Sequence, residues 1–332
     1  MTTIDFDKLF NSFSALKIGV VGDVMLDTYW WGKVDRISPE APVPVVAVTK
    51  KEQRIGGAGN VALNLVSLGA TVHAISVVGN DDEGKQLLDL LQKENINAAY
   101  IIKSEERITT NKIRIISRNQ HMMRLDAEVV YPLSVLEENN IIDAFERYVS
   151  LEKPALVILE DYNKGVLTQK VIEEVIAICK QHNILTAVDP KRKNFFSYKG
   201  VDIFKPNLQE IKEALNILVD NVSENSLHKM HLAINEKLNH NISLITLSEK
   251  GIYYESENNK SIIPTHIRSI ADVSGAGDTV IAVACVSYAA TKDIRLMAEI
   301  ANIAGGLVCE EVGTVAIDKL KLLDECKQLL SN

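Results

Sequence analysis

The residues best suited to chemistry in this chain stand in one short turn, Gly275-Ala276-Gly277-Asp278, directly before an apolar helical segment at 279–290. Glycine lets the backbone approach a ligand closely, and the free N–H groups at a helix N-terminus attract an anion. We predict an anion hole at Gly275, Ala276 and Gly277 that holds a phosphoryl group in transfer, with Asp278 beside it as the base for an attacking hydroxyl. A helix cap without a catalytic role is the alternative.

A second glycine-rich turn occupies residues 56–60, ahead of a helical segment at 61–68. A dinucleotide-binding fingerprint would follow the first strand directly, whereas this turn follows a proline-bearing segment. We interpret Gly56 and Gly57 as bringing backbone N–H groups against a sugar, and Asn60 as binding vicinal hydroxyls through its donor and its acceptor.

Two carboxylates, Asp23 and Asp27, follow the first apolar run at 18–21. Ligands of open α/β sheets collect outside the carboxyl ends of the strands. We therefore predict that both carboxylates accept hydrogen bonds from sugar hydroxyls. Capping of the loop is the alternative, and it applies more readily to Asp27 than to Asp23.

The elements that must position these residues are short apolar runs that alternate with longer segments of helical period. This order predicts an α/β fold with a doubly wound, mainly parallel sheet. The apolar runs are 18–21, 155–159, 185–188 and 242–246, and two of the helical segments are 168–182 and 207–218.

Further β-rich segments, which have no helices between them, lie at 43–48, 99–102, 112–116 and 122–125. They predict a small antiparallel β lid beside the main sheet. We expect insertions around 42–50 and 98–126 to form this lid within a single domain that spans 1–332, because the chain contains no internal repeat or linker.

The composition excludes several classes of protein. Of the 332 residues 46% are hydrophobic, and the formal net charge is −8, which argues against a broad surface for nucleic acid or anionic membrane. The four cysteines lie far apart, so neither a disulfide framework nor a zinc site is predicted. The N-terminus has no apolar leader, and the longest apolar stretch, 280–290, is too short to span a bilayer, so we expect a cytoplasmic protein.

Three further motifs complete a set: Asp189-Pro190-Lys191, Lys205-Pro206-Asn207 and Asn207-x-x-Glu210. Together with Gly22-Asp23 and the two glycine-rich turns, they resemble the motifs of the ribokinase-like (PfkB) carbohydrate kinases. The motifs come in the order of that family and cover nearly the whole chain.

The resemblance implies an ATP-dependent sugar kinase in which Asp278 is the catalytic base. It implies that Asn207 and Glu210 organise the ATP phosphates and Mg²⁺, with Glu210 acting on the metal through water. Further ATP-binding positions are implied at Lys205, Thr246, Ser248, Glu249 and Gly251. The sugar-binding positions that match the family are Asp23, Gly56, Gly57 and Asn60. A monovalent cation such as K⁺ is a further expected cofactor.

Within this family the chain is similar to the heptose 7-phosphate kinases. The likeness rests on residues 22–27, Tyr29-Trp30, 36–46, 117–120, 124–126 and Asp161-Tyr162-x-Lys164-Gly165. It implies phosphorylation of D-glycero-β-D-manno-heptose 7-phosphate at O1 to the 1,7-bisphosphate, a precursor of ADP-heptose and of the lipopolysaccharide core. Asp161 and Lys164 are further substrate-binding positions.

A sugar that already carries a phosphate needs a cationic pocket, and the lid segments supply four candidate cations. These are Lys112, Arg114, Arg118 and Arg124. Surface pairing with carboxylates such as Asp126 and Glu128 is the alternative.

The chain also departs from the family pattern. Val273 and Ser274 stand where Thr is common, and Glu160 precedes Asp161 where these heptose kinases carry a small Ser. Many of them are fused to a nucleotidyltransferase domain with a His-x-Gly-His motif, which none of the seven histidines forms, so we expect a stand-alone kinase. The expected partners are a sugar phosphate, ATP and a second copy bound through the lid. A kinase of ribose, fructose or a fructose phosphate, and a non-catalytic sugar- or nucleotide-binding regulator, are the rival interpretations.

Overall fold

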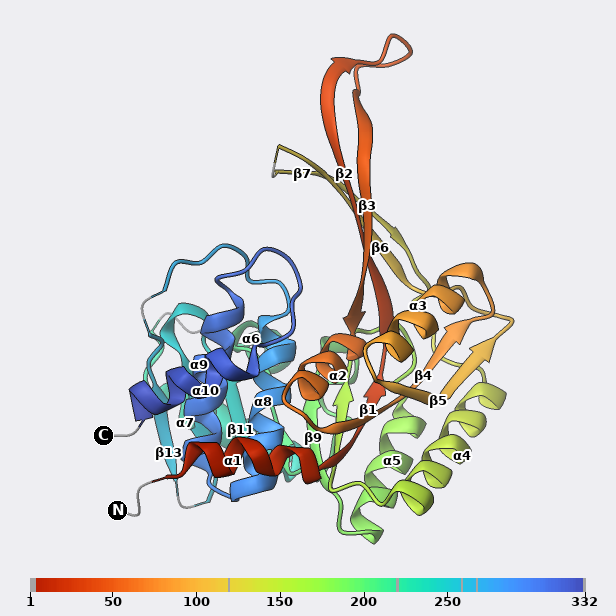
Figure 1. The fold of residues 1–332 in the computed structure, drawn as a ribbon. Coiled ribbons are helices and arrows are strands. Elements are labelled where there is room, and N and C mark those ends of the chain that lie inside the picture. Colours follow the sequence, from red (N-terminus) through yellow and green to blue (C-terminus); the bar gives the residue numbers. More distant parts are fainter. Residues whose placement is uncertain (1–3, 119, 219–220, 258, 267, 331–332) are drawn as a thin grey trace.

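The computed structural model describes residues 4–118, 120–218, 221–257, 259–266 and 268–330. Its main body is a nine-stranded sheet between layers of helices, and a second sheet projects from it (Figure 1). The strand order of the main sheet is β13-β12-β11-β10-β9-β8-β1-β4-β5.

The main sheet is parallel except for β12 and β13, which pair antiparallel at one edge. This arrangement confirms the predicted doubly wound α/β fold. The strands are β1 (Lys17–Gly22), β4 (Thr71–Gly79), β5 (Asn97–Ser104), β8 (Leu156–Glu160), β9 (Leu185–Asp189), β10 (Ile203–Phe204), β11 (Ile242–Thr246), β12 (Ile252–Glu255) and β13 (Lys260–Ile263).

Two separate hydrophobic cores cover the two faces of the main sheet, which is why its central strands are apolar without alternation. One core uses α1 (Phe6–Ser12), α2 (Ala58–Ser67), α3 (Asp82–Lys93), α8 (Ala276–Thr291), α9 (Ile294–Val308) and α10 (Lys319–Leu330). The other uses α4 (Val135–Glu152), α5 (Gln169–Gln181), α6 (Leu208–Leu215) and α7 (Glu224–Leu238). Among the described residues, no helix combines the length and the apolar character needed to cross a membrane.

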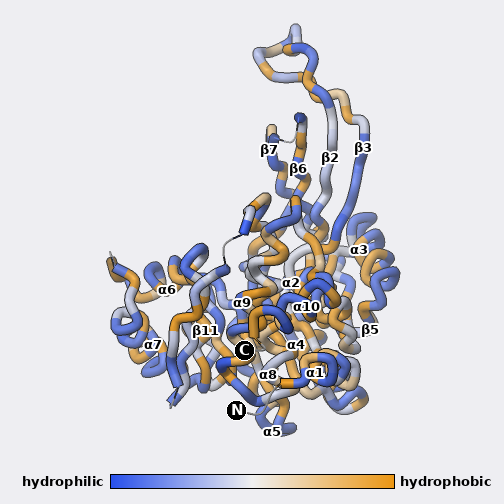
Figure 2. Tube along the Cα trace, turned by 60° about the vertical axis from the view of Figure 1, so that its left-hand side comes forward, coloured by the Kyte–Doolittle hydropathy of each residue, from blue (hydrophilic) through white to orange (hydrophobic). Residues whose placement is uncertain are grey.

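The lid is the second sheet, with strand order β3-β2-β6-β7. It consists of two antiparallel hairpins, β2 (Val24–Ile37) with β3 (Pro44–Gly57) and β6 (Asn111–Ser117) with β7 (Gln120–Ala127). A parallel pairing of β2 with β6 joins them. The β2–β3 hairpin extends as a long arm beyond the body, and hydrophilic and hydrophobic residues mix along it (Figure 2).

Two expectations about the lid need correction. The segment 99–102 does not belong to it, because it lies in β5, which pairs parallel with β4 at the edge of the main sheet. Residues 24–37 form a lid strand that the sequence analysis missed. Since β1 ends at Gly22 and β2 begins at Val24, the chain passes from the main sheet into the lid with a single residue between them.

Candidate active site

Asp278 lies in the first turn of α8, where Gly275 is the N-cap residue in a left-handed conformation (φ 80°). Its carboxylate is 95% buried and is held from two sides. The Asn60 amide donates to Oδ2 at 2.7 Å, and the Tyr162 hydroxyl donates to Oδ1 at 2.7 Å. The two glycine-rich turns therefore meet: a side-chain carbon on Gly275 would lie 2.9 Å from the Asn60 amide nitrogen.

Burial raises the pKa of Asp278 to about 6, and the hydrogen bonds from Asn60 and Tyr162 oppose this rise. A carboxyl group with such a pKa is ionised at neutral pH and still able to accept a proton. The predicted anion hole requires the N-terminus of α8 to be uncapped, and no side chain of the described residues caps it. One of its three donors is partly engaged, because the Ala276 N–H donates to the Val273 carbonyl at 3.3 Å. The anion hole stays a prediction.

Asp278 belongs to a carboxylate cluster with Glu160 and Asp189, in which one oxygen of each residue lies within 4.8 Å of the others. The fold assembles this cluster because Glu160 and Asp189 are register partners at the ends of β8 and β9. Lys205 Nζ lies 2.7 Å from Asp189 Oδ2, and Lys191 Nζ lies 3.6 Å from Oδ1.

The members of the carboxylate cluster differ in their protonation. Burial opposes ionisation of Asp189, but Lys205 and Lys191 outweigh it and lower its pKa. The pKa of Glu160 is raised, mainly by burial and next by the negative charge of Asp189. The sequence analysis gave no role to Glu160, Tyr162 or Asp189, because their contacts join segments that lie far apart in the chain.

Two of the residues expected to bind ATP, Asn207 and Glu210, lie next to Lys191. Asn207 and Glu210 form a capping box at the start of α6: the Glu210 N–H donates to Asn207 Oδ1 at 2.8 Å and the Asn207 N–H donates to Glu210 Oε2 at 2.8 Å. Glu210 Oε1 accepts from Lys191 at 2.7 Å. Both oxygens of Glu210 are thus engaged, which fits contact with magnesium through water better than direct ligation.

The remaining expected ATP-binding residues surround the end of β11. Thr246 forms a bridge with Asn207, and Ser248 and Glu249 are exposed in the short helix η3 (Ser248–Lys250). Gly251 has φ 96°, and a side chain there would collide with the Ile263 carbonyl. Lys205 is the exception to the expected arrangement, because it is buried against Asp189 in the carboxylate cluster.

Two aspartates expected to bind sugar have structural contacts that the sequence did not predict. Asp23 is buried and accepts backbone N–H bonds from Tyr162, Lys164 and Val166 at 2.9–3.0 Å, which fix the loop after β8. Burial raises its pKa. Asp161 accepts from the Tyr198 hydroxyl, the Asn194 amide and the Asn163 N–H. Sugar binding by Asp23 and Asp161 stays a prediction.

The base of the lid places Asp27 and Arg114 in contact as a partly buried ion pair. Gly56 faces this pair, because a side-chain carbon there would lie 2.4 Å from Asp27 Oδ2. The backbone of Gly57 (φ 59°) packs against the Asp23 carbonyl. The second glycine-rich turn and Asp27 thus lie in contact at the base of the lid, and their binding of sugar stays a prediction.

The four candidate cations of the lid fall into different environments. Lys112 has no ion pair among the described residues; its Nζ lies 5.5 Å from the centre of the Tyr162 ring, and burial lowers its pKa. Arg124 is exposed and pairs with Asp126, while Arg118 lies exposed in the β6–β7 turn, next to Asn119, which is outside the described residues.

Lys164, a further substrate-binding candidate, pairs with Glu128 at 2.7 Å. Burial is the main reason that the pKa of Lys112 is lowered, and the positive charge of Lys164 lowers it further.

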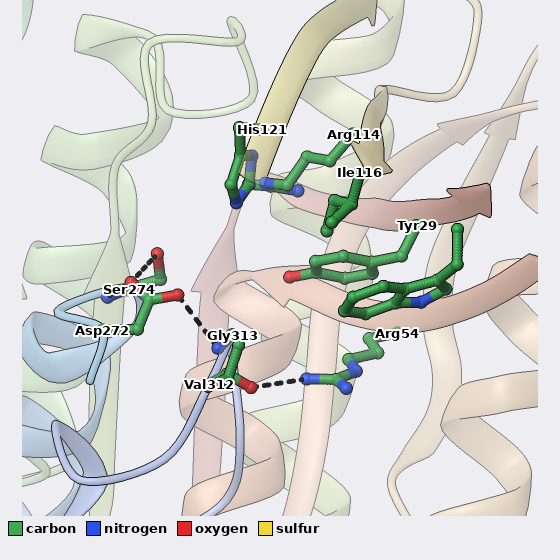
Figure 3. A pocket seen from close by; sticks show the side chains of 10 residues that line it. Tyr29, Arg54, Arg114, Ile116, His121, Asp272, Ser274, Val312 and Gly313 are labelled. Carbon is green, nitrogen blue, oxygen red and sulfur yellow. Dashed lines mark hydrogen bonds between the residues drawn. The ribbon is translucent and has the colours of Figure 1, made fainter. Parts of the chain in front are cut away.

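A pocket lies between the lid and the loops beside α8 (Figure 3). Arg114, Tyr29 and His121 line it from the lid, and Asp272 and Gly313 line it from the loops.

The Arg54 guanidinium closes one side of this pocket, because it donates to the Thr314 carbonyl at 3.0 Å. Neither Arg54 nor His121 was identified from the sequence, since isolated charged residues on a strand give no signal of what they face.

Comparison with known proteins gives the family of the chain. A family model described as "pfkB family carbohydrate kinase" matches residues 15–320. The bifunctional protein HldE of Aliarcobacter butzleri is 41% identical over 91% of this chain and 63% of its own length. HldE of Geobacter sulfurreducens is 37% identical over 96% of this chain and 64% of its own length. The chain therefore spans less than two thirds of these relatives.

Among solved structures, phosphofructokinase-2 from Escherichia coli in complex with potassium superimposes with a TM-score of 0.79 at 18% identity, covering 96% of this chain and 100% of that chain. This likeness supports the fold. From the match over residues 15–320, and from the HldE relatives, the chain belongs to the pfkB family of carbohydrate kinases, phosphotransferases that act on sugar hydroxyl groups.

Proposed function

We propose that this kinase transfers the γ-phosphoryl group of ATP to the 1-hydroxyl of D-glycero-β-D-manno-heptose 7-phosphate, giving the 1,7-bisphosphate. The observation that carries the transfer is the Asp278 carboxylate, buried at the N-terminus of α8 and held by Asn60 and Tyr162. The choice of heptose is supported by the 37–41% identity to proteins named HldE. The product would serve ADP-heptose and lipopolysaccharide synthesis.

In the proposed reaction the sugar 1-hydroxyl oxygen attacks the γ-phosphorus, and the bond from phosphorus to the β–γ bridging oxygen breaks. Its electron pair leaves with ADP, and the hydroxyl proton passes to Asp278. The N–H groups of Gly275 and Gly277 stabilise the phosphoryl oxygens. Magnesium would come with the nucleotide and would neutralise phosphate charge, and Asn207 and Glu210, which lies next to Lys191, would orient it.

The 7-phosphate of the proposed substrate requires a cation that is not already neutralised. Lys112 fits this role best among the four candidates, because it has no carboxylate partner in the described part of the chain and lies over the ring of Tyr162, whose hydroxyl contacts the base. Arg114 supports the same face but is paired with Asp27. A dianion beside Lys112 would gain a charge-assisted hydrogen bond without breaking an existing pair.

A coupled assay of ADP release tests the proposal. It should compare heptose 7-phosphate with free heptose, fructose 6-phosphate, ribose and fructose, each with Mg-ATP. We expect kcat/KM to be highest for heptose 7-phosphate. A higher value for fructose 6-phosphate, ribose or fructose would replace the heptose assignment, and no turnover with any sugar would favour a non-catalytic binding role.

The arm of the lid supports a second proposal, a homodimer. Apolar side chains are exposed along the lid: Ile37, Val43, Val48, Met122, Met123 and Leu125. Exposed strands with apolar residues favour pairing with another chain. Light scattering of the purified chain should give twice its mass, and a monomer would contradict the proposal.

The same preparation, assayed in K⁺ and in Na⁺, tests whether a monovalent cation is required.

A further inference from the structure

Arg54 is a lid residue that contacts the body of the enzyme next to the predicted anion hole. It lies on β3, where Asp27 is its register partner, and its side chain is 26% exposed. Its guanidinium donates to the Thr314 carbonyl at 3.0 Å and lies 4.9 Å from the centre of the Tyr29 ring. The transfer proposed above gives Arg54 no role, although this contact joins segments that are 260 positions apart.

The loop that Arg54 contacts, residues 312–314, follows α9 and turns at Gly313 (Figure 3). Gly313 has φ 75°, a conformation that glycine adopts without strain. A side-chain carbon at Gly313 would lie 2.9 Å from Arg54 Nη1, so the guanidinium packs directly against the backbone there. Arg54 Nη1 also lies 3.5 Å from the Val312 carbonyl. The loop thus presents a flat backbone surface and two carbonyls to the guanidinium.

The same loop packs against the turn that precedes α8. The Gly313 N–H donates to Asp272 Oδ2 at 2.9 Å, and Asp272 Oδ1 accepts from the N–H and the hydroxyl of Ser274. Thr314 approaches the N-cap residue of α8, because a side-chain carbon on Gly275 would lie 3.1 Å from Thr314 Cγ2. Gly275 supplies one N–H group of the predicted anion hole. The chain of contacts that begins at the lid therefore reaches the anion hole.

We propose that Arg54 is a positioning residue, which holds the loop at 312–314 against the turn at 272–275 and so links the lid to phosphoryl transfer. The proposal rests on the function proposed above, in which N–H groups of that turn stabilise the transferred group. A planar guanidinium can bind several acceptors in a fixed geometry, and Arg54 also donates to Glu52 Oε1 at 2.7 Å. Lid and turn would keep one relative position during the transfer, in which small displacements cost rate.

The contacts of Arg54 favour positioning over direct binding of the sugar phosphate. Its Nε and Nη1 already donate to Glu52 and to the Thr314 carbonyl. Lys112, by contrast, is proposed to bind that phosphate directly. A positioning residue acts on the transition state through geometry, so its loss should lower kcat and leave KM for the sugar unchanged. Loss of Lys112 should do the reverse.

Steady-state kinetics of Arg54→Met test this split, with whichever sugar the panel above shows to be the acceptor. Methionine keeps an apolar stem over Tyr29 and removes the donors. We expect kcat to fall about tenfold, while KM for the sugar and for ATP stays within about threefold of wild type. Arg54→Lys keeps one donor for the Thr314 carbonyl and should restore kcat to within about threefold of wild type.

Lys50→Met is the matched control, because Lys50 binds the other oxygen of the Glu52 carboxylate from the exposed arm. It should leave kcat and both KM values unchanged. Equal losses of kcat in Lys50→Met and Arg54→Met would overturn the proposal, since the cause would then be the lid carboxylate. A rise in KM for the sugar with kcat unchanged would overturn it too, and would make Arg54 a substrate-binding residue.

Hydrogen exchange of backbone amides gives a measurement that does not depend on catalysis. It is followed by mass spectrometry on the ligand-free enzyme at one fixed K⁺ concentration. In Arg54→Met, peptides containing Ser274 and Gly313 should exchange at least about fivefold faster, because the bonds of their N–H groups to Asp272 open more often. Peptides of α5, which belongs to the other core, should exchange as in wild type.

Unchanged exchange at both segments in Arg54→Met would contradict the link, and faster exchange in every peptide would show general destabilisation instead. If Arg54→Met fails to fold, Gly313→Ala takes its place in both measurements, because a side chain there would meet Arg54 Nη1 from the loop side. Failure of every sugar in the kinase assay would remove the proposed function, and the exchange rates would still decide whether Arg54 holds the turn.

Discussion

The carboxylate cluster and the lid hold their charged residues in opposite environments. Glu160, Asp189 and Asp278 are 95–100% buried, and the buried Lys205 pairs with Asp189. On the lid, the Arg124 side chain is 57% exposed and pairs with a carboxylate of its own strand. Charges that are shielded from water interact strongly and lose much when one partner is removed, whereas exposed pairs contribute little.

This difference divides the work of the enzyme between the two regions. The carboxylate cluster lies on the ends of central strands, so its geometry is fixed by both cores, and it suits the proton transfer. In the proposed reaction the lid would contact the substrate from outside through long side chains, which suits the choice of substrate. Substitutions in the cluster should therefore change kcat, and substitutions of the lid residues that contact the substrate should change KM.

The largest effect is expected for Asp278→Asn. The amide keeps the shape and can still contact Tyr162, but it cannot accept the hydroxyl proton, so kcat should fall by about 10²–10⁴-fold. ATP binding, measured by titration calorimetry, should stay close to wild type. A variant that retains more than about a tenth of wild-type turnover would show that the base lies elsewhere.

Lys112→Met tests the lid at a candidate cation that has no ion pair among the described residues and that, unlike the exposed Arg118, lies over the ring of Tyr162. Methionine keeps much of the apolar stem and removes the charge, so KM for heptose 7-phosphate should rise by about tenfold, equivalent to ~1.4 kcal/mol, while KM for ATP stays unchanged. Lys50→Met is the matched control, because Lys50 is an exposed lid lysine that pairs with Glu52. Equal effects of the two variants would remove the distinction between them.

The sequence predicted the central framework well, because strands such as β11 are continuous apolar runs that both faces of the sheet bury. The predicted run 242–246 coincides with β11. The lid was harder. Residues 24–37 mix charged and apolar side chains without a regular period, since the strand leaves the core partway along. Residues 99–102 have strand composition, but composition does not reveal which sheet edge a strand joins.

The candidate site shows the same limit. The turn at 275–278 identified Asp278 because glycine spacing and a helix start are local signals. The sequence could not predict that Tyr162 contacts Asp278. The two residues are 116 positions apart, and only the order of strands brings them together. Glu160 could be recognised as a departure from the family. That neither of its carboxylate oxygens has a hydrogen-bond partner among the described residues follows from its burial, which the sequence does not give.

Tyr162→Phe tests how the carboxylate cluster sets the pKa of its base. Asp278 works in its ionised form, so kcat should fall as the pH drops through about 6, the value to which burial raises its pKa. The Tyr162 hydroxyl lowers that pKa, and its loss should move the acidic limb up by about one pH unit, which cuts kcat at pH 6 about fivefold. Near pH 8.5 the two enzymes should converge.

A pH–rate profile of kcat for wild type and Tyr162→Phe measures this shift. The difference between the two profiles is the quantity to compare. If Tyr162→Phe lowered kcat by the same factor at every pH, Tyr162 would only position the base and would not tune it.

The smallest effect is expected for Arg124→Ala. Arg124 donates to both oxygens of Asp126 at 2.8 and 2.9 Å on the exposed strand β7, where solvent competes for both groups. Such a pair contributes below about 1 kcal/mol, so the free energy of unfolding should change by less than that and KM for heptose 7-phosphate by less than about threefold. Urea unfolding and steady-state kinetics measure the two quantities. Suppose that KM rose as much as in Lys112→Met. Arg124 would then break its pair with Asp126 and bind the substrate phosphate when the lid closes on the substrate. The lid would then use exposed charge as effectively as the cluster uses buried charge, and the contrast between the two regions would fail.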